Sequence, residues 1–156
     1  MFFQKQMQGG NAAPDRAPMS AEEADRRNLH VAACALLLEL AHADEEFSED
    51  ERMHIEAVMR RHFSLDEDTA QELIALAQLQ RKEAIDLYQF TRLVRENYDL
   101  GQKTVLAEIM WGLVMTDGRI AQDEATLLRK IANLLDLKPG YLSEARKRAE
   151  SDDAPA

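Results

Sequence analysis

An internal repeat constrains the fold of this chain more than any other feature, because residues 32–62 align with residues 105–135. In each copy an apolar run is followed by an acidic stretch and then by an amphipathic run. The matching positions keep their chemical character: Leu40 with Leu113, Asp44 with Asp117, Phe47 with Ile120, Glu51 with Glu124, Ile55 with Leu128 and Val58 with Ile131. Two copies of one helix–acidic turn–helix unit would pack most simply as a pseudo-twofold pair. The two central helices would then contact each other, and the acidic turns would lie close together.

Helical spacing of apolar residues extends from Ser20 to about Glu150, and no strand pattern interrupts it. The sequence therefore predicts an all-α fold of about seven helices. They are expected at about 20–43, 48–62, from 64, 82–98, 102–116, 121–135 and from about Pro139. The second half of the first helix is apolar nearly all round, and the fifth has one broad apolar face, so both are expected at the centre.

Local signals place the ends of these helices. Ser–x–x–Glu capping boxes are predicted at Ser20, Ser48 and Ser64, a tight turn at Gly101, and a helix start at Pro139. The inward face of the second helix is expected to carry Met53, Ile55, Val58 and Met59. The fourth helix is expected to bury Ile85, Leu87, Phe90, Leu93 and Val94.

Length and charge narrow the class of protein. A chain of 156 residues fits one domain with an ordinary core. We assign residues 1–19 to a flexible leader, 20–150 to the helical domain and 151–156 to a disordered tail. The formal charge of −10 repels nucleic acid and anionic lipid and favours cations and partner proteins with basic surfaces.

The single cysteine and the short apolar runs bear on the compartment. Cys34 lies within an apolar stretch and has no second cysteine to pair with, which is typical of a reducing cytoplasm. The longest nearly apolar stretch, residues 31–41, is interrupted by Glu39 and is far shorter than the ~20 residues that a membrane span needs. The N-terminus has no apolar region of signal-peptide length. The sequence thus predicts a cytoplasmic protein without membrane insertion.

The repeated acidic turn is the strongest candidate for a binding site. In the second copy, "DGRIAQDE" has the spacing of the second half of an EF-hand calcium loop, but Leu113 and Met115 stand where the earlier ligands would be. A hard cation would need oxygens pooled across the repeat. The metal hypothesis therefore names four carboxylates, with calcium or magnesium favoured over zinc: Asp44, Glu51, Asp117 and Glu124.

Helix capping is the alternative reading of the same carboxylates. Glu51 is the third residue of a capping box with Ser48, and acidic side chains in a first turn favour the helix dipole. In the second copy Ala121 replaces that serine although Glu124 is kept, so capping alone does not require the acid there. Both readings stay open at this stage.

Other candidate sites are weaker. His42, His54 and His62 lack zinc-motif spacing, and Cys34 has no base near it in the sequence. The large side chains Trp111, Met110 and Met115 could line a groove, but their helical spacing is more typical of a core. Because no nucleophile, base and oxyanion-donor set can be assembled, we expect no enzymatic activity.

Two stretches, "ALLLELAHADEEFSEDE" and "EIMWGLVMTDGRIAQDEATLLRKIANLLDL", resemble the tellurite-resistance TerB family and the related N-terminal domain of DjlA-type co-chaperones. The similarity covers about residues 28–148. It implies a bundle of roughly seven helices, working as a module of stress-response complexes in the bacterial cytoplasm, with acidic residues suspected of binding a metal. Glu45 replaces the glycine of the family's first "ADG", and Thr116 replaces the alanine of the second. No J-domain is present, so co-chaperone activity is not carried over.

The resemblance and the residues together lead to one functional expectation. We expect a non-catalytic helical module that binds a partner protein and a divalent cation through its two acidic turns. The alternative is an interaction scaffold that binds no metal and whose acidic residues only cap helices.

Overall fold

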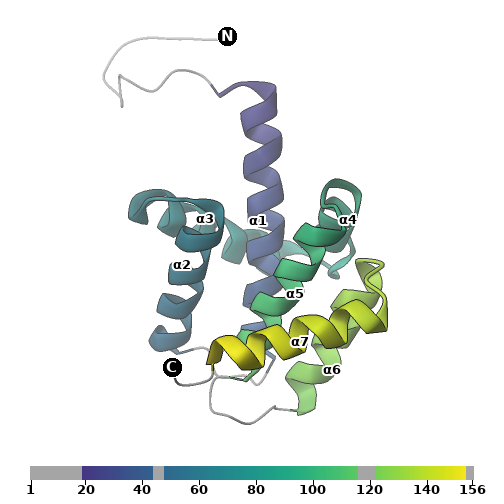
Figure 1. Ribbon diagram of the computed structural model, residues 1–156. Helices are drawn as coiled ribbons and strands as arrows, with labels where there is room; N and C mark the ends of the chain where they lie inside the picture. The colour runs from purple at the N-terminus through teal and green to yellow at the C-terminus, as the bar shows by residue number, and fades with distance from the viewer. Residues whose placement is uncertain (1–18, 44–47, 116–121, 154–156) are drawn as a thin grey trace, which may run out of the picture.

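The computed structural model describes residues 19–43, 48–115 and 122–153. All regular structure in these ranges is α-helical, as the sequence predicts. Seven helices follow one another along the chain (Figure 1): α1 (Ala21–Ala41), α2 (Glu49–Phe63), α3 (Glu67–Glu83), α4 (Tyr88–Asn97), α5 (Leu100–Val114), α6 (Gln122–Leu134) and α7 (Pro139–Asp153).

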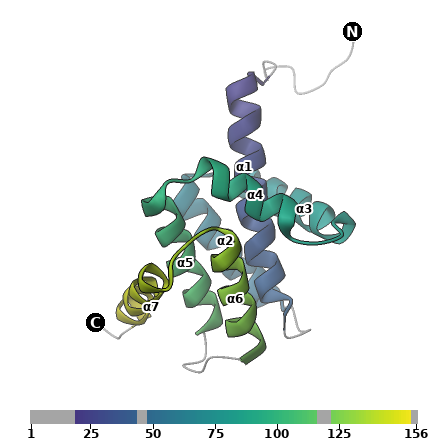
Figure 2. The same ribbon diagram turned by 90° about the vertical axis from the view of Figure 1, so that its right-hand side faces the viewer.

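The second half of α1 is the centre of the molecule. Every residue from Val31 to Ala41 except Glu39 is buried, and α1 packs against α2, α3, α4, α5 and α6. Its most extensive contacts are with α3 and α4, while α7 packs along α5. The run is apolar nearly all round because neighbours cover it on every side. The first turns of α1, in contrast, extend beyond the rest of the bundle (Figures 1 and 2).

The helix bounds follow the sequence repeat. The ends of α1 and α5, at Ala41 and Val114, are 73 residues apart, and so are the starts of α2 and α6, at Glu49 and Gln122. The two central helices contact each other, as expected for the pair. The contact between α1 and α5 is smaller than the contact of α1 with α3 or of α5 with α7. The duplication is therefore clearer in the order and bounds of the helices than in how they pack.

Capping boxes open α1 and α2 at the predicted residues. Ser20 and Ser48 each accept a hydrogen bond from the amide of the glutamate three residues on, at 3.1 Å, and that glutamate accepts one from the serine amide. These bonds satisfy amide groups that a helix start leaves without a partner.

The predicted capping box at Ser64 is wrong. Ser64 ends α2 instead, with a left-handed backbone (φ 55°, ψ 46°), and the amide of Leu65 bonds back to the carbonyl of Arg60 at 3.1 Å. Asp66 caps α3, because its carboxylate accepts a hydrogen bond from the amide of Thr69 at 2.8 Å. A three-residue link is enough to separate these helices, and Asp66 rather than Ser64 provides the cap.

The expected fourth helix, 82–98, is divided in the structure. The backbone of Ala84 is extended, so α3 ends at Glu83, and α4 starts only at Tyr88. Ile85, predicted to be buried, lies in the connection and is fully exposed, and Leu93 is 37 % exposed. Asp86 stabilises the break by accepting a hydrogen bond from the amide of Tyr88 at 2.9 Å. Phe90 and Val94 are buried as predicted.

Three further expectations need correction. Gly101 lies within the first turn of α5 and not in a tight turn, because a capping box between Asp99 and Gln102 starts that helix. Met53, assigned to the inward face of α2, is 56 % exposed. Val105 was expected on the broad apolar face of the fifth helix, but it is 41 % exposed on α5. On α2 and on α5, the apolar residues therefore span a wider face than the neighbouring helices cover.

The C-terminal helix starts at Pro139, as predicted, and buries Ala145 and Ala149. It continues to Asp153, three residues into the segment assigned to a disordered tail. Of the predicted leader, residues 1–19, only Met19 is described, and residues 1–18 lie outside the described ranges. No helix in those ranges is both long and apolar enough to cross a membrane.

Candidate functional site

The helix ends that flank the two acidic stretches lie at the same end of the molecule. Figures 1 and 2 both show the ends of α1 and α5 and the starts of α2 and α6 at this end, opposite the first turns of α1. We call this region the acidic end. Of the four predicted metal ligands, Glu51 and Glu124 are described, while Asp44 and Asp117 lie outside the described residues.

Glu51 is engaged in capping. Its Oε1 accepts hydrogen bonds from the Ser48 amide at 3.1 Å and from the Ser48 hydroxyl at 3.3 Å. Glu124 is half-buried in the first turn of α6. Each acid thus lies where the dipole of its own helix favours a negative charge. The capping assignment of Glu51 is confirmed, and this leaves its second carboxylate oxygen as the atom more available to a ligand.

His42 joins the acidic end to α3. Its Nε2 lies 3.5 Å from Nε2 of Gln78, and Gln78 accepts a hydrogen bond from Arg81, which also pairs with Glu39 of α1 at 3.3 Å. Burial and the nearby Arg81 lower the pKa of His42, against the opposing effect of Glu39 and Glu51. This partly buried network fixes the C-terminal end of α1 against α3.

The described histidines, cysteine and carboxylates form no group of three or more that could hold a metal ion. His54 is exposed on α2, and His62 lies at its far end. Cys34 is fully buried, and burial raises the pKa of its thiol to about 12, so it is not an activated nucleophile. Trp111, Met110 and Met115 belong to the core, as their spacing indicated.

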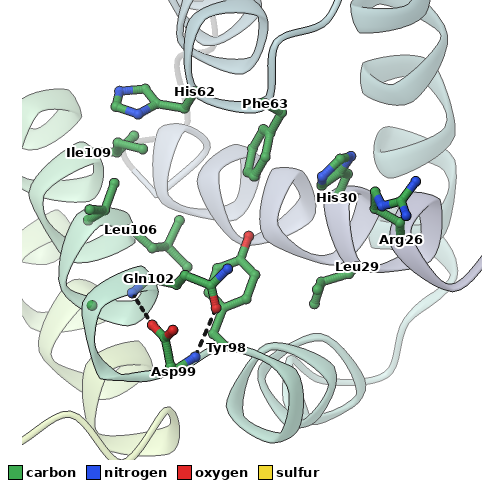
Figure 3. A pocket seen from close by; sticks show the side chains of 12 residues that line it. Arg26, Leu29, His30, His62, Phe63, Tyr98, Asp99, Gln102, Leu106 and Ile109 are labelled. Carbon is green, nitrogen blue, oxygen red and sulfur yellow. Dashed lines mark hydrogen bonds between the residues drawn. The ribbon is translucent and has the colours of Figure 1, made fainter. Parts of the chain in front are cut away.

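A groove that the sequence did not reveal lies beside the projecting part of α1 (Figure 3). Its volume is about 670 Å³. The groove is lined by α1, the end of α2, the link into α5, and α5 itself, through Arg26, Leu29, His30, His62, Phe63, Tyr98, Asp99, Gly101, Gln102, Val105, Leu106 and Ile109. The spacing of Arg26, Leu29 and His30 places them on one face of α1. Nothing in the sequence, however, indicates that this face joins α2 and α5 to form a groove.

Several contacts fix the shape of the groove. The rings of His30 and Phe63 lie 4.4 Å apart between centroids, which joins α1 to α2. Asp99 and Gln102 bond to each other's amides at 2.8 and 2.9 Å and hold the first turn of α5. The hydroxyl of Tyr98 points towards the middle of the groove (Figure 3), and burial raises the pKa of Tyr98 to about 12. Its phenol is therefore neutral and can donate a hydrogen bond.

The surroundings of His30 and His62, which line the groove, favour the neutral form of each imidazole. Burial, followed by the charge of Arg26, lowers the pKa of His30. Burial and Arg61 do the same for His62. An anionic group entering the groove would oppose both shifts, because it favours the protonated imidazole.

Comparison with known proteins identifies one family. The family model described as tellurite resistance protein TerB matches residues 30–147, which includes both copies of the repeat and all seven helices in part or in full. No curated protein and no solved structure matched the chain in the corresponding searches.

Proposed function

This chain belongs to the TerB family of tellurite resistance proteins, and from that premise we propose that it is a non-catalytic interaction module. The module works in the bacterial cytoplasm as part of a tellurite-resistance-like stress response. Its acidic end binds a partner protein that has a basic surface, together with a divalent cation held by the acidic turns.

The arrangement of the helix ends is the observation that supports this proposal. The ends of α1 and α5 and the starts of α2 and α6 lie at one end of the molecule, so the helix ends that flank the acidic stretches of both copies are on the same side. Glu49 and Asp50 at the start of α2 are exposed there. In a chain of net charge −10, this end offers the negative potential that would attract a cationic surface.

The cation would be held by oxygens from both copies of the repeat. Asp44 and Asp117 would supply carboxylates from the turns, Glu51 its oxygen beyond the capping bonds, Glu124 a second helix-start carboxylate, and water the remaining positions. Calcium and magnesium prefer such all-oxygen sets, whereas zinc prefers nitrogen and sulfur ligands. We therefore propose calcium or magnesium before zinc.

A metal-independent scaffold is the second candidate, and the capping box of Ser48 and Glu51 favours it. The described hydrogen bonds give Glu51 a structural role that needs no ion. In that case the acidic residues would contribute only helix capping and surface charge to a protein-binding adaptor.

Titration calorimetry with calcium, magnesium, zinc and manganese separates the two candidates. The test variant is D44N/D117N, and the matched control is E72Q/E83Q, which removes two exposed charges from α3. If the cation binds, the wild type and the control release or absorb heat on titration. At an ion concentration of 100 times Kd their free energy of unfolding should rise by about 2.7 kcal/mol. The test variant should lose both effects.

An absence of heat and of any shift in melting temperature at millimolar ion would reject the cation. Complexes recovered from bacterial extracts then test the scaffold. Their yield should fall as salt is raised, because screening weakens contacts between charged surfaces, and should not change with chelator. A complex that resists high salt would contradict the acidic end as its binding surface.

A further inference from the structure

We propose that the groove between α1, α2 and α5 is a docking site for residues 1–7 of the same chain. This segment reads MFFQKQM, and its apolar side chains would fill the groove while residues 8–18 connect it to α1. Residues 1–18 lie outside the described ranges and outside the match to the family model, which begins at residue 30. The inference therefore concerns this chain and not the family, and it is independent of any metal.

The groove offers an apolar strip that is open to solvent. Leu29, Phe63 and Ile109 are partly buried against the core, and Leu106 lies between them at 2 % exposure. Val105 stands on the rim at 41 % exposure. Six of the twelve lining residues are exposed, so a segment lying in the groove would keep one side in water. Such a site suits a peptide better than a small molecule, which is usually enclosed.

The charges that line the groove cancel at neutral pH. Arg26 and Asp99 have opposite signs, and the lowered pKa of His30 and of His62 favours two neutral imidazoles. The lining therefore selects its occupant by apolar area and not by a strong charge of either sign.

The segment at residues 1–7 supplies that apolar area. Four of its seven residues are large and apolar: Met1, Phe2, Phe3 and Met7. An aromatic side chain buries roughly 150–250 Å² when it is covered, so Phe2 and Phe3 would contribute most of the contact. Residues 154–156, at the other end of the sequence, read Ala-Pro-Ala and offer much less.

The groove lies within reach of this segment. The described part of the chain begins at Met19, and α1 leads directly to Arg26, Leu29 and His30 on the groove wall. Leu29 follows Ser20 by nine residues, which is about 14 Å along the helix. The twelve residue steps from Met7 to Met19 span up to about 40 Å when extended. The connection is therefore long enough to return along α1 to the groove (Figures 2 and 3).

Covalent connection makes a modest contact sufficient. A short linker holds two groups at an effective concentration of about a millimolar. If the separate peptide bound with a Kd of about 100 µM, its tethered form would occupy the groove in roughly nine molecules of ten. An apolar contact of two phenylalanines is therefore enough to keep the groove covered.

Polar groups in the groove can pair with the backbone of the segment. The hydroxyl of Tyr98 points towards the middle of the groove and can donate a hydrogen bond to a carbonyl (Figure 3). The neutral imidazoles of His30 and His62 each have one donor and one acceptor nitrogen. Such partners matter because the amide and carbonyl groups of a docked peptide lose contact with water.

The charge beside the groove agrees with this occupant. Lys5 is the sole charged side chain among residues 1–14. The exposed charged residues on the first turns of α1 have an acidic majority: Glu22, Glu23, Asp25, Arg26 and Arg27. A segment lying along these turns would place its one positive charge near a slightly negative surface.

The first test compares the methyl NMR signals of the full chain with those of F2S/F3S. The signals of Leu29, Leu106 and Ile109 should shift, because the two aromatic rings no longer lie against them, while those of Ile74 and Leu128 in the core should not. The matched control is Q4S/Q6S, which replaces two polar residues of the same segment and should keep the wild-type spectrum. Identical groove signals in the wild type and F2S/F3S would overturn the proposal.

The second test measures competition. A fluorescently labelled MFFQKQM peptide is titrated with each full-length protein while its anisotropy is recorded. F2S/F3S should bind the peptide about tenfold more tightly than the wild type or Q4S/Q6S, because its own segment no longer competes. The peptide MSSQKQM should not bind. Equal affinity of the wild type and F2S/F3S for MFFQKQM would contradict occupancy of the groove by the chain's own segment.

Rim variants made in the F2S/F3S background locate the site. V105E and V105K should each weaken the labelled peptide by about tenfold, because a charge of either sign on the apolar rim disfavours the two rings. L100E is the matched control, since Leu100 is another exposed apolar residue of α5 that does not line the groove. Melting curves identify any variant whose fold is impaired. Peptide binding that survives both V105E and V105K would place the site elsewhere and reject this groove.

A second copy of the chain is the remaining alternative occupant. If the groove signals of the wild type approach those of F2S/F3S on dilution, and sedimentation shows a dimer that F2S/F3S lacks, the segment docks on a partner copy. That result would contradict docking within one chain. Signals that are independent of concentration, from a monomer, would support it.

Discussion

Burial sets the chemistry of Cys34 at the residue scale. Its side chain has 0 % exposure in the middle of α1, and burial raises the pKa of the thiol to about 12. The reactive thiolate is therefore suppressed as well as shielded. We predict that a thiol reagent modifies the native protein only as fast as the core opens. In denaturant, one thiol per chain should react at once. Rapid modification of the native protein would show that α1 is less protected than its packing indicates.

Arg146 of α7 lies over the ring of Trp111 of α5. The guanidinium carbon lies 5.2 Å from the centre of the indole ring, and Trp111 is 2 % exposed. We predict that R146M lowers the free energy of unfolding by about 0.5–1 kcal/mol and changes the emission of this single tryptophan. K147M, at the neighbouring exposed position, is the control and should leave both unchanged. Unaltered emission in R146M would argue against the ring contact.

At the scale of the element, the two ends of α2 differ in what their serines do. Ser48 caps the start through hydrogen bonds with Glu51, whereas Ser64 ends the helix in the left-handed region at φ 55°. We predict that S48A destabilises the protein by about 1 kcal/mol through the lost cap. S64G should stabilise it by about 0.5–1 kcal/mol, because glycine adopts this backbone without steric strain. Denaturant unfolding measures both. A destabilised S64G would mean that the serine side chain has a role its backbone geometry does not explain.

These helix ends also show what the sequence could predict. The repeat and the apolar spacing identified an all-α fold, and the local capping boxes at Ser20 and Ser48 were placed correctly. The Ser64 box has the same pattern and is wrong, because Asp66 offers a competing cap two residues later. Local patterns define which caps are possible, but the packing of neighbouring helices selects among them.

Two features were not predicted, for a related reason: the connection between α3 and α4, and the groove. Ile85 and Leu93 continue the helical spacing, yet Ile85 is fully exposed and Leu93 is 37 % exposed, so periodicity overestimated the buried face. The groove combines Arg26, Phe63 and Ile109 from three helices, and nothing local in the sequence joins them. For the acidic turns, the sequence identified four carboxylates. The structure describes Glu51 and Glu124, and the metal hypothesis stays a prediction.

The whole molecule carries its charge unevenly. The chain has a net charge of −10, and Glu49 and Asp50 at the start of α2 are exposed. The same distribution affects stability, because acidification protonates carboxylates and relieves their mutual repulsion, while the partly buried histidines respond in the opposite direction.

The pH dependence of stability should reveal the groove histidines. Burial lowers the pKa of His30 and His62 below the ordinary value of 6.5, with Arg26 and Arg61 adding to the effect. Below pH 6.5 the unfolded chain therefore binds protons that the folded chain resists. Their contribution to stability is present above that pH and is lost as the pH falls through the folded values.

We predict that H30N/H62N shows a smaller loss of unfolding free energy than the wild type between pH 7 and pH 5. The carboxylate contribution is common to both proteins and cancels in the difference, although the lost ring contact with Phe63 will lower stability equally at every pH. H54N, which replaces the exposed histidine of α2, is the control and should follow the wild-type slope. The measurement is denaturant unfolding at a series of pH values. If H30N/H62N kept the wild-type slope, the two imidazoles would be as accessible to protons in the folded chain as in the unfolded one.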